Sequence, residues 1–261
     1  MPPPIYTIAN CRPAYQLNWS LSVFWNEPAE NDAWLGDLAE ATEGDGVRIL
    51  QHRFVQPATS QFLASTRPET APPAIAQSVK GRLQYLVRDK RAKAFRRHYG
   101  LRSVGSVSRN DVEQYVRGQL EHHPMADRSV QQRLGRFQID QPHVDLTQPR
   151  RSGHAEYRYN LHVVFVNDAR YMEIREERLA AIRDMILRAS EKHEHLVSKA
   201  AIIPDHIHLA VGCRLDQSPA EVALGYMNNL AYAVGQTAIF RYGFYVGTFG
   251  EYDLGVIPPG P

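Results

Sequence analysis

An internal repeat is the feature that most constrains the fold of this chain, because two copies of one element order predict two copies of one structural unit. The segments 15–24 and 157–166 align as β-strands, and each has a tyrosine followed three residues later by an asparagine. A helical pattern follows each strand, at about 33–41 in the first copy and about 175–195 in the second. Both copies therefore begin with a strand and then a helix.

The rest of each copy repeats in the same order. Apolar strand pairs with a central proline come next, at 47–66 and 196–212, and each precedes a helix, the second of which Ser218 is placed to cap. Short strands that end in glycine, at 99–105 and 244–250, complete the copies. The order β-α-β-β-α-β predicts an α+β fold of two tandem ferredoxin-like (split βαβ) units with antiparallel sheets, related by a pseudo-twofold.

The boundary between the copies is predicted at 124–153, where prolines and glycines interrupt any periodicity. We therefore expect a first unit at 1–123, a linker at 124–153 that is partly helical around 127–137, and a second unit at 154–261.

Composition excludes several classes of protein. With 43% hydrophobic and 22% charged residues the chain is expected to fold rather than to be disordered. Its apolar runs are far shorter than the roughly 20 residues of a membrane-spanning helix, and its start does not have the pattern of a secretory signal. Cys11 and Cys213 are isolated and form no disulfide framework. We expect a cytoplasmic protein with reduced thiols that contacts no membrane.

Basic residues are concentrated in one stretch, although the formal net charge of +2 alone does not indicate nucleic-acid binding. Between 80 and 102, nine lysines and arginines are opposed only by Asp89. Such a stretch is a candidate phosphate-contacting surface, and a solvated helix face and loop is the alternative. The residues expected to contact DNA are Lys80, Arg82, Arg88, Arg91, Arg96 and Arg97.

Two histidines lie two residues apart in a predicted strand of the second copy. His206 and His208 follow Pro204 and Asp205, and in a strand residues two apart point to the same face. This histidine pair is suited to bind a metal ion from two points. The alternative is a pair of surface or core-edge histidines.

A predicted helix in the first copy carries a phenol and an amide on one face. Ser108 and Asp111 form a helix start similar to a capping box, and Tyr115 and Gln119 follow at i and i+4. The alternative is an ordinary amphipathic helix with a half-buried tyrosine.

Together, the histidine pair and the Tyr-x-x-x-Gln helix resemble the single-tyrosine HUH transposases, which include small insertion-sequence and REP-associated tyrosine transposases. The resemblance covers most of the chain, counted as two copies. It implies that His206, His208 and Gln119 hold a divalent metal, Mg²⁺ or Mn²⁺. It also implies that Tyr115 attacks single-stranded or hairpin DNA, forming a 5′-phosphotyrosine and leaving a 3′ hydroxyl.

The two copies differ from that family pattern in complementary ways. Thr59 and Gln61 stand where the second copy has its histidine pair, and after Gly250 we expect no room for a second tyrosine helix. In the family, active sites are built across homodimers. We therefore predict a fused pseudo-dimer with one composite active site, which functions as a monomer.

Other functions stay open at this point. The chain is alternatively a catalytically silent, domesticated DNA-binding protein that uses the basic stretch and aromatic stacking, an unrelated metal hydrolase or a small-molecule regulator. Tyr252 is a rival nucleophile that lacks a glutamine one turn later. His122 and His123 are candidate DNA contacts or solvated residues at a helix end, and His162 is unassigned. The transposase hypothesis requires Tyr115 close to the histidine pair.

Overall fold

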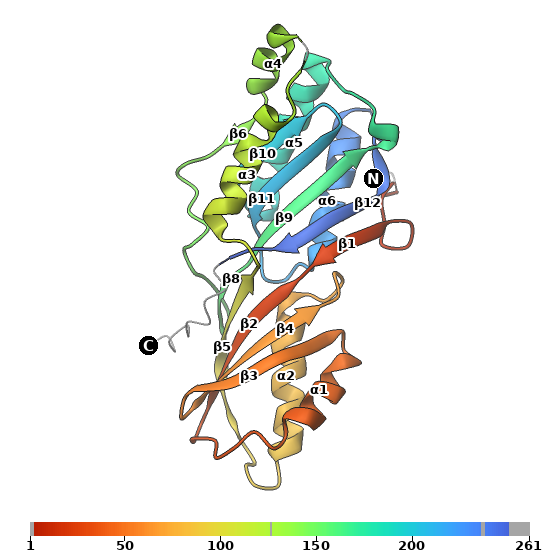
Figure 1. The fold of residues 1–261 in the computed structure, drawn as a ribbon. Helices are drawn as coiled ribbons and strands as arrows, with labels where there is room; N and C mark the ends of the chain where they lie inside the picture. Colours follow the sequence, from red (N-terminus) through yellow and green to blue (C-terminus); the bar gives the residue numbers. More distant parts are fainter. Residues whose placement is uncertain (1–2, 126, 236–237, 251–261) are drawn as a thin grey trace.

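The computed structural model describes residues 3–125, 127–235 and 238–250, which form two α+β units (Figure 1). The elements of the first unit are β2 (Asn18–Trp25), α1 (Leu35–Glu43), β3 (Val47–Gln56), β4 (Thr59–Thr66), α2 (Pro72–Val87) and β5 (Phe95–Val104). Those of the second are β9 (Asn160–Asn167), the 3₁₀ turn Asp168–Arg170, α5 (Glu176–His193), β10 (Leu196–Ile203), β11 (His206–Gly212), α6 (Pro219–Ala233) and β12 (Phe240–Thr248). The predicted β-α-β-β-α-β order is present in both.

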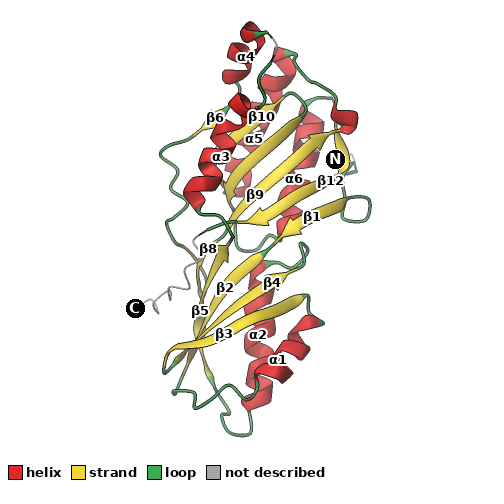
Figure 2. Cartoon of the chain, viewed as in Figure 1, coloured by secondary structure: helices red, strands yellow, loops and turns green. Residues whose placement is uncertain are grey.

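The strand order within each unit is also the same. Four antiparallel strands lie in the order β3-β4-β2-β5 in one sheet and β10-β11-β9-β12 in the other. Two helices pack together behind each set of four, α1 with α2 and α5 with α6 (Figure 2). Two ferredoxin-like units, predicted from the repeat, are therefore confirmed.

The two units exchange their leading strands. β1 (Arg12–Gln16) pairs in parallel with β12 of the second unit, and β8 (Ala155–Arg158) pairs in parallel with β5 of the first. Only Leu17 separates β1 from β2, and only Tyr159 separates β8 from β9, so each chain segment passes directly from one sheet into the other. The prediction of antiparallel sheets therefore holds for the four core strands, whereas these two added pairs are parallel.

Helix α5 buries the face that its apolar spacing predicts. On α5, Leu179, Ile182 and Ile186 are buried against the second sheet. The start of α6 has a complete capping box, in which the Ser218 hydroxyl accepts from the Glu221 N–H and the Glu221 carboxylate accepts from the Ser218 N–H.

The segment between the repeats has structure of its own. It contains a helix where one was expected, α4 (Arg128–Gly135), whose first turn is capped by the carboxylate of Asp127. Two short strands were not foreseen. β6 (Ile139–Asp140) pairs with β10 and β7 (Arg150–Ser152) pairs with β8, so this segment extends both sheets.

Helix α3 (Arg109–His122) leaves the first unit and crosses the open face of the second sheet, opposite α5 and α6 (Figure 1). Val112 and Val116 on α3 form a small apolar cluster with Ala201, Ile203 and Ala210 of β10 and β11. This packing fixes the helix of one repeat on the sheet of the other. In the described part of the chain, no helix has the length and apolarity that crossing a membrane requires.

Candidate active site

Strand β11 places both histidines of the pair on the sheet face that α3 covers. The alternating residues Ile207 and Leu209 point into the main core, as the strand periodicity predicts. The rings of His206 and His208 have centroids 5.0 Å apart, and both side chains are buried. The two imidazoles therefore form one buried group beneath α3.

Both imidazoles are held through Nδ1. His206 Nδ1 lies 2.6 Å from Asp205 Oδ1, and the other oxygen of Asp205 accepts from Arg170 at 2.8 Å. Arg170 occupies the left-handed region at φ 54°, an uncommon conformation for a residue with a side chain. His208 Nδ1 lies 3.0 Å from Nε2 of His162 on the neighbouring strand β9.

These contacts favour one tautomer of each imidazole. A carboxylate accepts, so His206 carries its proton on Nδ1 and its Nε2 keeps a lone pair. The same arrangement follows for His208 if its Nδ1–H donates to His162. Acceptors on the far nitrogen are the usual support of metal-binding histidines, because they fix the ring and raise its basicity.

Burial keeps this group neutral. It lowers the pKa of His208 to about 2 and that of His162 to about 4. Burial is also the main cause that lowers the pKa of His206, against the opposing effect of Asp205. Neutral imidazoles are the form that binds metal ions.

Tyr115 lies against this group. Its ring centroid is 5.6 Å from that of His208 and 5.9 Å from that of His162, both in edge-on orientation. The side chain is 48% exposed, so solvent and a ligand have access to the phenol. The structure thus brings the tyrosine of the first repeat to the histidines of the second.

Gln119 is buried on the same face of α3, one turn after Tyr115. Its Nε2 donates to the Tyr115 carbonyl at 3.1 Å, which leaves Oε1 as the atom suited to ligate a cation. His123 and His122 extend this face. The ring of His123 packs edge-on against His206 at 4.8 Å, and that of His122 lies 6.5 Å from Tyr115.

The side chains near Tyr115 include ligand types that a divalent cation accepts, but they are few in number. Within the described residues, no group of three or more His, Cys, Asp or Glu side chains is arranged to hold a metal ion. A site here therefore needs the amide oxygen of Gln119 beside the two imidazoles. Both Nδ1 atoms have partners, and two imidazoles with one amide oxygen leave coordination positions for a phosphate, so these residues fit such an ion.

The corresponding strand of the first unit carries a hydrogen-bonded polar layer instead. Thr59 and Gln61 are buried, Gln61 Nε2 donates to the Ser20 hydroxyl at 2.8 Å, and Gln61 Oε1 accepts from Arg53 at 3.0 Å. The amide of Gln61 is used in these contacts, and neither position offers an imidazole.

Half of the basic residues expected to contact DNA make structural contacts in the first unit. Lys80 donates through Nζ to the main-chain carbonyls of Arg96 and Arg97. Arg82 pairs with Asp45 at 3.0 Å. Arg91 donates to the carbonyls of Glu27 and Pro28.

The remaining three basic residues lie at the surface. Arg88 stacks on the ring of Tyr85 at 4.0 Å, and the side chains of Arg96 and Arg97 lie exposed on β5. Because Arg88 directly follows α2 and Arg96 and Arg97 lie at the start of β5, these residues lie at the far end of the first unit from α3 (Figure 1). The structure does not bring the basic stretch to the histidine pair.

The sequence pattern did not predict three residues of the site: His162, Asp205 and Arg170. Asp205 directly precedes the pair, which is a signal the sequence does contain. His162 is found only from the strand register, in which it lies opposite Ala210 on β11. Tyr252 lies outside the described residues.

Residues 155–257, which include the histidine pair, match the family model "Transposase IS200 like". This match supports a transposase-like domain in the second copy. No curated protein matches the chain. A crystal structure of a candidate transposase from Deinococcus radiodurans R1 is similar at 16% identity, covering 41% of this chain and 92% of that one, with a TM-score of 0.31. An unknown protein from Galdieria sulphuraria is similar at 8% identity over 89% and 97%, with a TM-score of 0.24.

Proposed function

We propose that this protein cleaves and rejoins single-stranded or hairpin DNA at one composite active site, with Tyr115 as the nucleophile. The observation that carries the proposal is the edge-on contact of Tyr115 with His208, because it joins a phenol of the first unit to the histidine pair of the second. The transposase-like match over 155–257 supports the same reaction class.

The reaction consists of two exchanges of phosphate esters. The Tyr115 hydroxyl oxygen attacks phosphorus and its proton passes to water, while the bond from phosphorus to the 3′ oxygen breaks and that oxygen takes up a proton. The products are a 5′-phosphotyrosine and a 3′ hydroxyl. A 3′ hydroxyl then attacks the phosphotyrosine, which releases the phenol and joins the strands.

The residues around Tyr115 prepare this step. A phenol has an unperturbed pKa near 10, so attack at neutral pH requires an electrophilic phosphate. A divalent cation, Mg²⁺ or Mn²⁺, held by His206, His208 and Gln119, would polarise that phosphate. Asp205 and His162 hold the imidazoles in place, and the half-exposed position of Tyr115 admits the strand.

A covalent adduct is the test. The protein is incubated with a 3′-labelled hairpin oligonucleotide and Mg²⁺ or Mn²⁺, then analysed on a denaturing gel, because a 5′-phosphotyrosine keeps the 3′ part of the strand on the protein. We expect a labelled protein band that Tyr115→Phe abolishes and that the matched control Tyr232→Phe, on an exposed tyrosine of α6, retains. An adduct that persists in Tyr115→Phe would show that the nucleophile is a different residue.

The same experiment separates the alternative of a silent DNA-binding protein. If the wild-type protein binds the hairpin but forms no adduct with either cation, it is a catalytically silent DNA-binding protein. Retained binding in Tyr115→Phe with loss of the adduct supports the catalytic proposal.

A further inference from the structure

Helix α3 covers part of the sheet face that carries the histidine pair. It packs on β10 and β11, whereas no helix of the described residues lies over β12 and β1 on this side (Figure 1). Strand β1 comes from the first repeat, so the exchange of leading strands widens this uncovered area. Tyr115 lies at the border of the area, because its ring contacts His162 of β9.

The strand register shows which side chains line the uncovered area. Tyr245 of β12 lies opposite Val164 of β9, which in turn lies opposite His208 of β11. On its other side Tyr245 lies opposite Ala14 of β1. Side chains at paired positions leave the same face of a sheet, so Tyr245 shares the face of His208. The row that leads away from His208 therefore offers a partly exposed aromatic ring between two short side chains.

A glycine makes room for the Tyr245 ring on the sheet. Gly247 follows two residues later on the same face, and a methyl group there would overlap with the Tyr245 hydroxyl oxygen and lie 2.9 Å from Cζ. The ring therefore takes the space of the missing side chain and leans along the strand. Its exposed surface faces away from the sheet, where a flat ligand can stack on it.

The same ring is connected to the nucleophile. The imidazole of His162 contacts both phenols, with ring centroids 5.9 Å from Tyr115 and 5.8 Å from Tyr245. Burial raises the pKa of Tyr245, so its phenol stays neutral beside the phosphates of a bound strand. Arg12, exposed and opposite Gly243 on the same face, adds a positive charge. Aromatic stacking beside a cationic side chain is typical of surfaces that bind single-stranded nucleic acid.

We propose that Tyr245 stacks on a nucleobase of the DNA strand that Tyr115 attacks, and that Gly247 gives the ring the orientation for stacking. The identity of the strand rests on the proposed function. Every base has a π face, so the contact holds the strand without selecting its sequence. Because the His162 imidazole touches both phenols, the stacked nucleotide lies close to the scissile phosphate.

Binding of a fluorescent hairpin oligonucleotide with single-stranded flanks tests the stacking. A Tyr115→Phe background prevents cleavage during the measurement. Tyr245→Leu is expected to weaken the affinity about tenfold, the loss of one stacked base, whereas Tyr245→Phe keeps the ring and should retain the affinity. The control is Tyr242→Leu, at an exposed tyrosine of the same strand whose ring packs against Tyr6. Equal affinities of the two leucine variants, or a loss in Tyr245→Phe, would overturn the inference.

A scan with abasic positions separates stacking from a structural effect. One base at a time is removed from the single-stranded flanks. With Tyr245 present, removal at one position should weaken binding about tenfold, and in Tyr245→Leu the same removal should cost little, because the stacking partner is already absent. If every position gives the same loss in both proteins, Tyr245 supports the fold and binds no base.

Gly247→Ala tests the orientation with the ring intact. The added methyl group displaces the Tyr245 ring, so this variant should weaken binding, and it should have little further effect when combined with Tyr245→Leu. Independent effects of the two changes would contradict the role of Gly247. A position-specific loss in Tyr245→Leu, in a protein whose wild type forms no adduct, supports the base site and contradicts only the nicking reaction. An adduct in wild type without any such loss contradicts only the base site.

Discussion

Ser103 and Thr248 occupy equivalent positions in the two units and make equivalent hydrogen bonds across the junction. The Ser103 hydroxyl accepts from the N–H of Asn160 and donates to the carbonyl of Phe249, both at 2.9 Å. The Thr248 hydroxyl accepts from the N–H of Asn18 at 2.8 Å and donates to the carbonyl of Val104 at 2.7 Å.

This reciprocity gives the pseudo-twofold a physical basis. Asn18 and Asn160 are the asparagines shared by the aligned repeat strands, and each begins the strand that follows the crossover from the other sheet. One hydroxyl on each side satisfies a donor and an acceptor where the two sheets meet. The exchange of β1 and β8 therefore costs few hydrogen bonds.

Replacing these hydroxyls should destabilise the junction. Ser103→Ala and Thr248→Val each leave a main-chain N–H and a carbonyl without their partner, and each should lower the free energy of unfolding by about 1–3 kcal/mol. Urea denaturation followed by fluorescence measures the change. The exposed Ser106→Ala is the control. A loss below about 0.5 kcal/mol for both variants would mean that water replaces the hydroxyls.

The sequence predicted those parts of the site that depend on local periodicity. Strand alternation placed His206 with His208, and helical spacing placed Tyr115 with Gln119, because both patterns depend only on neighbouring residues. The repeat predicted the two units and, through the complementary losses, which of these residues to look for together. The contact between Tyr115 and His208 agrees with that expectation.

The other features of the site depend on contacts between segments that are far apart in the sequence. His162 joins the site through the register of β9 with β11, which no local pattern specifies. Lys80 was expected to contact DNA because of its charge, yet it donates to main-chain carbonyls of β5. A basic residue in a charged stretch has the same sequence signature whether its partner is a carbonyl of its own chain or a phosphate.

His162 should affect metal binding through His208. His162→Ala removes the acceptor for the Nδ1–H of His208, so the ring loses its orientation, and the affinity for Mn²⁺ should fall about 10–100-fold. Titration calorimetry or electron paramagnetic resonance measures it without DNA. His154→Ala, at an exposed histidine in the turn between β7 and β8, should leave the affinity unchanged. An unchanged affinity in His162→Ala would remove this residue from the site.

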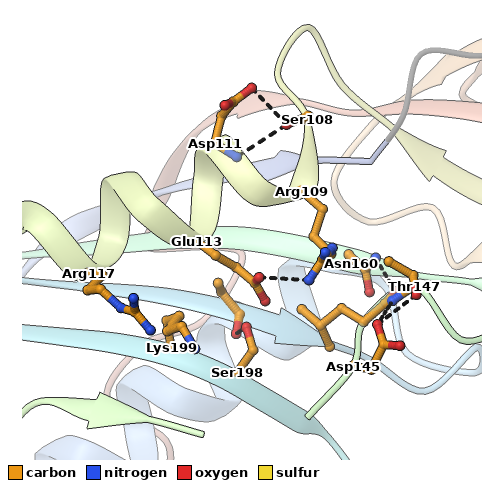
Figure 3. A network of polar contacts seen from close by, with 12 residues as sticks. Ser108, Arg109, Asp111, Glu113, Arg117, Asp145, Thr147, Asn160, Ser198 and Lys199 are labelled. Carbon is orange, nitrogen blue, oxygen red and sulfur yellow. Dashed lines mark hydrogen bonds and ion pairs between the residues drawn. The ribbon is translucent and has the colours of Figure 1, made fainter. Parts of the chain in front are cut away.

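Asp140 should hold α3 on the second sheet. Its carboxylate accepts from buried Lys199 of β10 at 2.6 Å and pairs with Arg117 of α3 at 2.7 Å (Figure 3 labels both basic residues). Asp140→Asn weakens both pairs, and because the carboxylate is partly exposed the cost should be about 1–2 kcal/mol. Hydrogen exchange should become faster in α3. Unchanged exchange there would show that the apolar contacts of Val112 and Val116 suffice.

Acidification should destabilise the fold through His195. Burial, the largest cause, lowers its pKa to about 4, against hydrogen bonding to Gln217, while His193, Arg150 and Arg214 lower it further. In the unfolded chain His195 binds a proton near pH 6.5, whereas in the folded chain it binds one only near pH 4. The stability that depends on neutral His195 is therefore full above pH 6.5 and falls as the pH drops toward 4. This gap corresponds to about 3 kcal/mol.

The His195 contribution is isolated by comparison. Urea unfolding at pH 7 and pH 4.5 should show a smaller pH-dependent loss in His195→Asn than in the wild type, since other buried histidines contribute to both proteins equally. His143→Asn, at an exposed histidine that does not contribute to the pKa of His195, is the control. The same loss in His195→Asn and wild type would contradict the assignment of the acid sensitivity to this residue.

Mixing two inactive variants should fail to restore activity. In the structure Tyr115 contacts His208 of its own chain, whereas a site built between two chains would draw these residues from different molecules. Tyr115→Phe lacks the nucleophile and the double variant His206→Ala, His208→Ala lacks the imidazoles. If the composite site lies within one chain, as the fused architecture predicts, every site in the mixture still lacks either the nucleophile or the imidazoles. The adduct on the denaturing gel should therefore be absent from the mixture and present for wild type at the same concentration. An adduct that appears on mixing would show that the site forms between chains, and light scattering would then have to reveal a dimer.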